Sequence, residues 1–295
     1  MIDLDQLDAF IAISERGTVT AAARKLHRTQ SAISRRLALL EDALGAQLFD
    51  RRGAKLALSD CGRAFLPFAE SALAALVSGR EAVQQQLAPD AGSVSIAIVG
   101  PLVETPLAAA LRALPRASSK LSVLTASSAE VSRLVRRGDA NLGVRYFEDE
   151  DTELAYVRLG TERMCVVGAP DHGPPRKRER WIGFPTTRTA KDDLGRLLAQ
   201  QLAAAGLRSP EVMVVDSLSA QKRLVEVGLG IALLPESSVR EELARGTLVR
   251  LDVPRVATTI DIHLVHRHAG YLSPAARAVI ALLRRAFTAK PTPKR

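Results

Sequence analysis

The stretch from Val19 to Leu44 constrains the fold more than any other part of the chain, because its pattern predicts two short helices joined by a tight turn. Thr29 is a good N-cap for the second helix, since its hydroxyl can accept a hydrogen bond from a free backbone N–H of the first turn. Apolar residues in this helix recur at the spacing of one buried face, at Ile33, Leu37, Leu40 and Leu44. The inward face of the first helix comprises Val19, Ala22, Ala23 and Leu26, and its two alanines allow close packing of the second helix. Such a pair is typical of a helix-turn-helix.

The opposite face of the second helix is polar and basic near its first turn. A helix-turn-helix presents this part of its second helix to the major groove of DNA. Arg35 can donate twice to a guanine edge and Gln30 can pair with an adenine edge, whereas Ser31 and Ser34 suit phosphate or secondary base contacts. An ordinary solvated helix face is the alternative, and the surrounding motif favours groove contact. The predicted DNA-binding residues of this stretch are Arg28, Thr29, Gln30, Ser31, Ser34 and Arg35.

The residues after this helix predict a two-stranded wing. Gly45 breaks the helical pattern, Phe49 is expected to return to the core, and residues 50–53 are expected to form a turn before a short strand at residues 55–58. Arg51 and Arg52 then lie at the wing tip, where they are predicted to bind phosphates of the backbone beside the groove. Their loss should weaken binding to all DNA sequences alike.

A long helical pattern runs from Ser59 to Leu87 with an apolar stripe too extensive for a lone exposed helix. The stripe predicts a partner, most simply its own copy in a second subunit. Pro67 is expected to kink or restart this helix, because proline removes a backbone hydrogen bond. Residues 88–92, with Pro89 and Gly92, are the predicted hinge. The stripe comprises Phe65, Phe68, Ala69, Ala72, Leu73, Leu76, Val77, Val83 and Leu87.

Beyond the hinge, strand and helix patterns alternate, which predicts parallel sheets with helices on their faces. A helix is expected from the loop at residues 100–101 through residue 114, and a strand at residues 164–168. Ligands of such α/β lobes lie at the carboxyl ends of strands and at helix N-termini. The hydroxyls of Thr125 and Ser127 and the charge of Arg145 suggest a small carboxylate, although the first loop lacks a hydroxyl and leaves a more apolar ligand, or none, open. For each residue the alternative is a capping hydroxyl or a surface arginine. The candidate ligand contacts are Gly100, Pro101, Leu102, Thr125, Ser127, Arg145, Thr186, Ser217 and Gly228.

Composition narrows the class of protein. The net charge of +9 lies beyond residue 90, so the expectation of DNA binding depends on the local basic clusters around Arg24, Arg35 and Arg51. No basic segment followed by a long apolar run is present near the start, and no apolar run approaches a membrane span, which predicts a cytoplasmic protein without membrane contact. Cys61 and Cys165 are far apart and are expected to be inert thiols.

A histidine cluster, an acidic run and a basic run are not expected to form binding sites. The cluster His263, His266 and His268 lacks a further ligand at suitable spacing, so neither a metal site nor a cofactor is predicted. The acidic run at residues 148–151 lacks the alternating pattern of a calcium loop and is expected to be a solvated loop. The basic run at residues 176–180 is expected to be an exposed loop.

One N-terminal pattern comprises Leu7, Phe10, Gly17, Thr18, Ala21, Ala22, Leu26, Gln30, Ser34, Leu40, Glu41, Leu44, Gly45, Leu48, Phe49, Arg51, Leu58, Ser59 and Gly62. With the downstream segments Leu111–Pro115, Gly138–Val144 and Val225–Pro235, it resembles the LysR-type transcriptional regulators over essentially the whole chain. Departures are small: Thr18 and Ser59 replace the commoner Ser and Thr, Ser31 replaces a frequent Pro, and Asn141 replaces an Asp.

The resemblance implies a multidomain fold with an N-terminal winged helix-turn-helix, a long linker helix and a C-terminal α/β two-lobed effector domain like that of periplasmic binding proteins. The implied divisions are a DNA-binding domain at 1–58, a dimerisation helix at 59–87, a hinge at 88–92 and an effector-binding domain at 93–295. Lobe I is expected at about 93–160 plus 267–290 and lobe II at about 161–266, with crossings near Gly160 and His266.

The resemblance also implies a function. The expected activity is control of transcription at a DNA promoter, tuned by a small-molecule effector. The expected partners are a second copy in a homodimer, a tetramer of two dimers, and RNA polymerase. A solute-binding protein would explain the last 200 or so residues but needs an export signal and no DNA reader. An enzyme would need a convergent catalytic set, and none is evident.

Overall fold

The computed structural model describes residues 1–52, 55–87, 92–113, 119–149, 151–173, 179–186, 194–207, 210–256 and 258–288. The chain divides into two compact units. The first unit comprises Met1–Gln84 together with the short segment Arg136–Gly138, and the second comprises Gln85–Val135 and Asp139–Arg295. None of the helices in the described ranges combines the length and the apolarity that crossing a bilayer requires.

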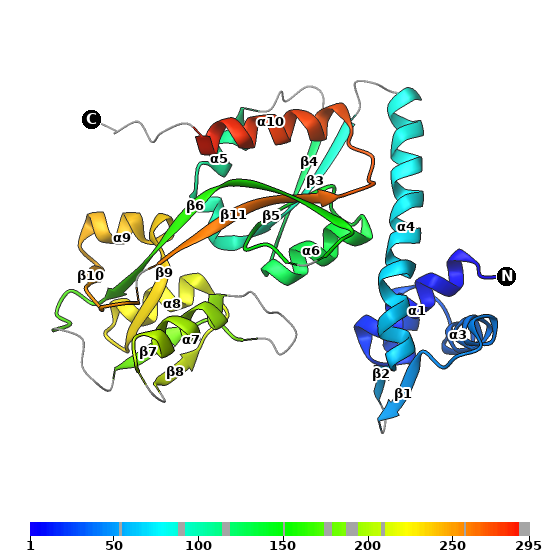
Figure 1. The fold of residues 1–295 in the computed structure, drawn as a ribbon, viewed down its shortest axis with the longest axis horizontal. Helices are drawn as coiled ribbons and strands as arrows, with labels where there is room; N and C mark the ends of the chain where they lie inside the picture. Colours follow the sequence, from blue (N-terminus) through cyan, green and yellow to red (C-terminus); the bar gives the residue numbers. More distant parts are fainter. Residues whose placement is uncertain are drawn as a thin grey trace. The chain divides into compact units, whose positions relative to one another are not determined.

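The first unit is helical with a small two-stranded sheet (Figure 1). Phe10 lies at its centre and is fully buried, with ring centroids 5.5 Å from those of both Phe49 and Phe65. The predicted return of Phe49 to the core is therefore confirmed. The elements in chain order are α1 (Leu4–Arg16), α2 (Val19–Lys25), α3 (Gln30–Leu44), β1 (Phe49–Arg52), β2 (Lys55–Leu58) and α4 (Asp60–Leu87).

Local capping chemistry sets the ends of these helices. Asp3 begins α1 with a capping box, in which its side chain accepts from the Gln6 N–H and the Gln6 side chain accepts from the Asp3 N–H. Gly17 and Gly45 end α1 and α3 at φ 70° and 66°, a left-handed conformation that residues with a Cβ rarely adopt. Thr18 caps α2 by accepting from the Ala21 N–H.

Helix α4 is continuous from Asp60 to Leu87 and contains Pro67. The helix therefore does not restart at Pro67, and a kink there, the other expected outcome, stays a prediction. Phe65 and Ala69, on either side of the proline, pack against the same core of the first unit, and this packing holds both turns in one helix despite the missing N–H.

Two glycines of α4 offer a matched test of the packing at its start. A Cβ on Gly62 would lie 2.1 Å from the Leu48 carbonyl oxygen, whereas a Cβ on Gly79 would meet nothing within 4 Å. We expect Gly62→Ala to destabilise the first unit by about 1–3 kcal/mol through overpacking. We expect Gly79→Ala to stabilise it by about 0.5–1 kcal/mol through helix propensity. Urea unfolding followed by circular dichroism measures both, and equal effects of the two variants would contradict the described packing of Gly62 against Leu48.

The second unit is built on one sheet. Its strands in the described ranges follow the order β4-β3-β5-β11-β6-β9-β7-β8, with β10 paired to β6. The strands are β3 (Gly92–Val99), β4 (Ser119–Ala126), β5 (Leu142–Tyr146), β6 (Leu154–Gly168), β7 (Arg180–Gly183), β8 (Glu211–Val214), β9 (Ile231–Pro235), β10 (Val249–Leu251) and β11 (Thr258–Arg267). The helical elements are η1 (Gly100–Glu104), α5 (Leu107–Arg112), α6 (Ser128–Arg137), α7 (Leu194–Ala204), α8 (Leu218–Glu226), η2 (Glu236–Val239), α9 (Arg240–Arg245) and α10 (Pro274–Thr288).

Two parallel groups of strands form the two lobes. Strand β3 pairs in parallel with β4 and β5, and β7 pairs in parallel with β8 and β9, as the alternating pattern predicts. The long antiparallel strands β6 and β11 run side by side and join the two groups (Figure 1). The sequence pattern predicted only residues 164–168 of β6. Strand β11 pairs with β5 from Ile262 to Val265, and the predicted return to lobe I near His266 stays a prediction.

Candidate nucleic-acid interface and ligand cavity

The first candidate site is the start of α3. The Thr29 hydroxyl accepts from the Ala32 N–H at 3.2 Å, so Thr29 is the N-cap that the sequence predicts. Ile33 and Leu40 are fully buried, which fixes the rotation of the helix about its axis. The predicted contact residues on the other side are therefore held outward, and all four are exposed: Gln30, Ser31, Ser34 and Arg35.

The turn between α2 and α3 also presents polar groups. His27 adopts φ 52°, which reverses the chain after α2, and Arg28 and Thr29 follow it on the surface. The Thr20 hydroxyl donates to Gln30 Oε1 at 3.3 Å. This bond uses one lone pair of the amide oxygen, so the second lone pair and the NH₂ group of Gln30 stay available for a base edge.

Some arginines near α3 form ion pairs within the protein, and others do not. Arg36 pairs with Asp5 of α1, and Arg63 pairs with Asp60. Arg28 and Arg35 have no ion-pair partner in the described part of the chain. Arg28 and Arg35 therefore offer charge to an external anion, as phosphate and base recognition requires.

The wing differs from its prediction in one detail. Strand β1 extends to Arg52, which pairs with Lys55 of β2, so residues 50–52 belong to the strand and not to a turn. The antiparallel register that starts at Phe49 and Leu58 continues to Arg52, because each further pair adds ladder hydrogen bonds. The side chains of Arg51 and Arg52, and residues 53 and 54, lie outside the described residues.

The second candidate site is a cavity of about 610 Å³ between the two lobes. Its lobe I wall comes from the ends of β3 and β4, from η1 and from the start of α6, and its lobe II wall comes from the segments that follow β7 and β8. Strand ends and helix starts therefore meet at one cavity, as the sequence predicts for paired α/β lobes. Its lining comprises Val99, Gly100, Pro101, Glu104, Thr125, Ala126, Ser127, Ser128, Ala129, Phe184, Pro185, Leu194, Asp216, Ser217, Leu218 and Ser219.

Five of the nine predicted ligand contacts line this cavity: Gly100, Pro101, Thr125, Ser127 and Ser217. Three others are placed elsewhere. Leu102 is fully buried in the core of lobe I. Thr186 lines a separate apolar hollow beside α7. Gly228 follows the C-terminal end of α8, whereas the cavity lies at the N-terminal end of this helix. The nine residues of α8 span about 13 Å, so Gly228 is far from the cavity. Thr187, beside Thr186, lies outside the described residues.

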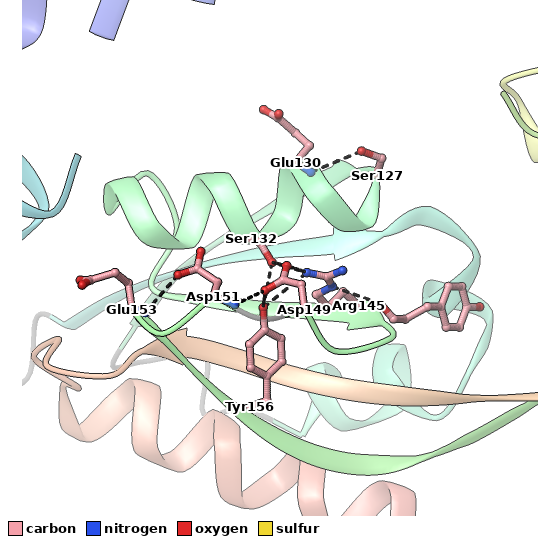
Figure 2. A network of polar contacts seen from close by, with 9 residues as sticks. Ser127, Glu130, Ser132, Arg145, Asp149, Asp151, Glu153 and Tyr156 are labelled. Atoms are coloured by element: carbon pink, nitrogen blue, oxygen red, sulfur yellow. Dashed lines mark hydrogen bonds and ion pairs between the residues drawn. The ribbon is translucent and has the colours of Figure 1, made fainter. Parts of the chain in front are cut away.

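Arg145 is the fourth predicted contact that does not line the cavity. Its side chain is fully buried and pairs with Asp149 (Figure 2). It also donates from Nε to the Tyr146 carbonyl at 3.1 Å and contacts the hydroxyls of Ser132 and Tyr156. The expectation that its charge faces a ligand is corrected, because four groups of lobe I already surround the guanidinium.

The same network corrects the interpretation of the acidic run at residues 148–151. Asp149 is not simply solvated, because it folds back onto Arg145 and accepts from the Tyr156 hydroxyl at 2.5 Å. Partial burial acts to raise the pKa of Asp149, but the Tyr156 hydrogen bond and the Arg145 charge outweigh it and lower the pKa below its usual value. Burial and the Asp149 bond raise the pKa of Tyr156. Glu150 lies outside the described residues.

The histidines and cysteines do not converge. His263 lies edge-on to Tyr156, with ring centroids 6.1 Å apart, and burial lowers its pKa. Burial raises the pKa of Cys165 to about 11, and Cys61 is exposed. Across the described ranges, no group of three or more His, Cys, Asp and Glu side chains is placed to hold a metal ion.

Glu104 of the cavity wall was not predicted from the sequence. The expected helix through residue 114 begins instead as the 3-10 helix η1, which ends at Glu104. Pro106, the N-cap of α5, gives a signal for this break, because a proline disfavours the helical conformation of the residue before it, and Thr105 is extended.

Comparison with known proteins agrees with this arrangement. Residues 4–63 match the family described as "Bacterial regulatory helix-turn-helix protein, lysR family", and residues 88–288 match "LysR substrate binding domain". The chain is 29% identical over 297 residues to the HTH-type transcriptional regulator CbbR of Rhodospirillum rubrum, with 96% of each chain covered.

Two solved structures share the fold. The crystal structure of ArgP from Mycobacterium tuberculosis is similar with a TM-score of 0.65 and 22% identity, and the likeness covers 96% of each chain. Full-length CbnR complexed with its target DNA is similar with a TM-score of 0.57 and 22% identity, and the likeness covers 96% of this chain and 99% of that one.

Proposed function

This chain belongs to the LysR family of transcriptional regulators, and from that premise we propose that it reads a specific promoter through the start of α3 and adjusts this binding to a ligand in the cavity between its lobes. As a family member it is a DNA-binding regulator with an effector-binding domain. The observation that carries the proposal is the exposed start of α3. Buried Ile33 and Leu40 hold Gln30 and Arg35 outward, which is the geometry that major-groove readout needs.

The proposed contacts divide by chemistry. Arg35 and Gln30 read base edges, with Ser31 and Ser34 beside them. Arg28 and Thr29 at the helix start, and Arg51 and Arg52 of the wing, bind phosphates and set the register of the protein on the duplex. CbnR, which shares this fold, is the protein whose structure contains target DNA.

We also propose a homodimer formed through α4. Phe68, Leu76, Val83 and Leu87 are exposed on this helix, with 70%, 50%, 60% and 80% of their surfaces accessible. Exposed apolar side chains along a 28-residue helix favour a second helix as a partner. A tetramer of two dimers and contact with RNA polymerase complete the proposal, which places the protein in the cytoplasm with the DNA.

Solute transport and catalysis are the weaker alternatives. A solute-binding protein has no use for the exposed polar start of α3. Catalysis would require a convergent set of reactive groups, and the described lining of the cavity offers only hydroxyls and two carboxylates that share no hydrogen bond with them. The relatives that the chain matches are transcriptional regulators, and we propose no reaction for it.

Selection from random double-stranded DNA tests the proposed function. We expect the full-length protein to enrich one sequence with two half-sites separated by whole helical turns, as a two-fold symmetric dimer requires. A DNase I footprint on the enriched sequence, and on the DNA upstream of the gene, then locates the operator. A scrambled duplex of equal length and composition is the control. Equal binding to the selected and the scrambled duplex would contradict the proposal.

A further inference from the structure

In the described lining of the cavity between the lobes, the charged side chains are all of one sign. Glu104 and Asp216 are the charged residues in its described lining, and both are carboxylates. Glu104 ends η1 in lobe I, and Asp216 comes two residues after β8 in lobe II. Neither carboxylate has a hydrogen-bond or ion-pair partner in the described ranges. Acidic groups at a concave site create a negative potential that repels simple anions and attracts cations. The described part of the wall therefore disfavours the simple carboxylate that the hydroxyls of Thr125 and Ser127 and the charge of Arg145 suggested.

The same cavity also offers groups that bind an anion. Helices α6 and α8 both begin at its wall, one from each lobe. Ser127 accepts from the Glu130 N–H, and Ser217 accepts from the Ala220 N–H, so each cap occupies one first-turn donor. The earlier N–H groups, such as those of Ala129 and Ser219, have no partner within their own helix, and the helix dipole adds positive potential there.

Ser128 is the independent sign that a ligand belongs at the start of α6. Its residue surface is 6% exposed, it lines the cavity, and its hydroxyl has no hydrogen-bond partner among the described residues. The residue is almost wholly buried but borders the cavity, so its hydroxyl can donate a hydrogen bond to an acceptor bound there. The Ser128 hydroxyl therefore marks the position of an acceptor such as a carboxylate.

We propose that the ligand of this cavity is a zwitterion of the α-amino acid class. Its carboxylate binds at the start of α6, to the Ser128 hydroxyl and the free first-turn N–H groups. Its ammonium group lies toward the Glu104 and Asp216 carboxylates. This assignment rests on the proposed function, and it reconciles two features of the wall that a simple acid or a simple amine would satisfy only in part.

A matched set of ligands tests the assignment on the full-length protein. The set contains the twenty L-amino acids, the same molecules without the amino group, and the same molecules without the carboxylate. We expect at least one amino acid to raise the melting temperature, and calorimetry to show roughly tenfold or greater weakening when either charged group is removed. A simple acid that binds as tightly as its amino acid, or a lack of stabilisation by all twenty amino acids, would overturn the assignment.

Three variants locate the two groups. Asp216→Asn should weaken binding of the amino acid roughly tenfold, and it should weaken binding of the acid without the amino group much less. A merely structural role would not change the ratio of the two affinities. Ser128→Ala should weaken the amino acid and the acid alike. Asp252→Asn, at an exposed carboxylate outside the cavity, is the control and should change neither. Unchanged affinity in Asp216→Asn would overturn the placement of the ammonium group.

Promoter binding by the ligand-free protein, measured on the same samples, separates the two proposals. A protein that binds the selected operator and ignores every amino acid refutes only the zwitterion. A protein that binds no specific duplex refutes the proposed function, whatever the calorimetry shows.

Discussion

Replacing Arg35 with alanine is expected to abolish the footprint on the operator while the fold stays intact. Arg35 is exposed at the start of α3 and has no ion-pair partner in the described structure, so its loss disturbs no internal contact. A bidentate arginine–guanine contact contributes about 1–3 kcal/mol of discrimination, and the two copies in a dimer would lose about 2–6 kcal/mol together. Binding to a scrambled duplex should change little, because phosphate contacts dominate non-specific affinity.

Arg36→Ala is the matched control for this experiment. Arg36 is the next residue of the same helix, but it is turned toward α1 and pairs with Asp5. Removing it takes away one positive charge, as Arg35→Ala does, without touching the proposed base contact. We expect the Arg36→Ala footprint to persist. A footprint that survives in Arg35→Ala, or that is lost equally in both variants, would contradict base readout by Arg35.

Most elements of the first unit could be predicted from the sequence, because local chemistry determines them, although the strand continues through residues 50–52 and the long helix does not restart at Pro67. A hydroxyl at Thr29 caps the helix that follows, and a glycine at position 45 ends it. The apolar period of α3 then decides which face is buried, so the exposure of Gln30 and Arg35 follows without any knowledge of distant residues.

The second unit was predicted less completely, because its long strand β6 depends on pairing with residues far away in the sequence. The first ten residues of β6 become a strand through pairing with β11, about a hundred positions later. Local periodicity carries little of that information, since cross-strand neighbours stabilise a sheet. The candidate cavity shows the same limit. Its capping serines were found from local pattern, whereas the acidic wall formed by Glu104 and Asp216 depends on how two lobes meet.

Arg145 was misplaced for a related reason. An arginine near the end of a predicted strand is usually solvated, and its position beside a loop suggested a ligand contact. The structure buries it fully, because Asp149, only four residues later, folds back to supply the opposite charge. Ser132 of α6 and Tyr156 of β6 complete the surroundings (Figure 2). No pattern within the loop itself distinguishes such a partner from a solvated acid.

Arg145→Met is therefore expected to destabilise the second unit by about 1–3 kcal/mol, because it removes a charged hydrogen-bond partner of Asp149, which is partly exposed and keeps its bond from Tyr156. Methionine keeps much of the side-chain volume, so the loss reflects the charge and its hydrogen bonds. Arg158→Met is the control, because Arg158 pairs with Asp261 at 2.8 Å on the surface and exposed pairs contribute little. Chemical unfolding of both variants measures the difference. Equal losses would show that the Arg145–Asp149 pair does not stabilise lobe I.

The pH dependence of that loss identifies Asp149 as the partner. The pKa of Asp149 is lower in the folded protein than its usual value, so its contribution to stability is present above the unfolded pKa, about 3.9, and is lost as the pH falls through the folded pKa. Arg145→Met removes the charge and the hydrogen bond that lower this pKa, while burial still raises it. The difference in unfolding free energy between the wild type and Arg145→Met should thus be largest near neutral pH and shrink below about pH 4, where protonation neutralises the carboxylate in both proteins. A difference independent of pH would instead assign the loss to packing around residue 145.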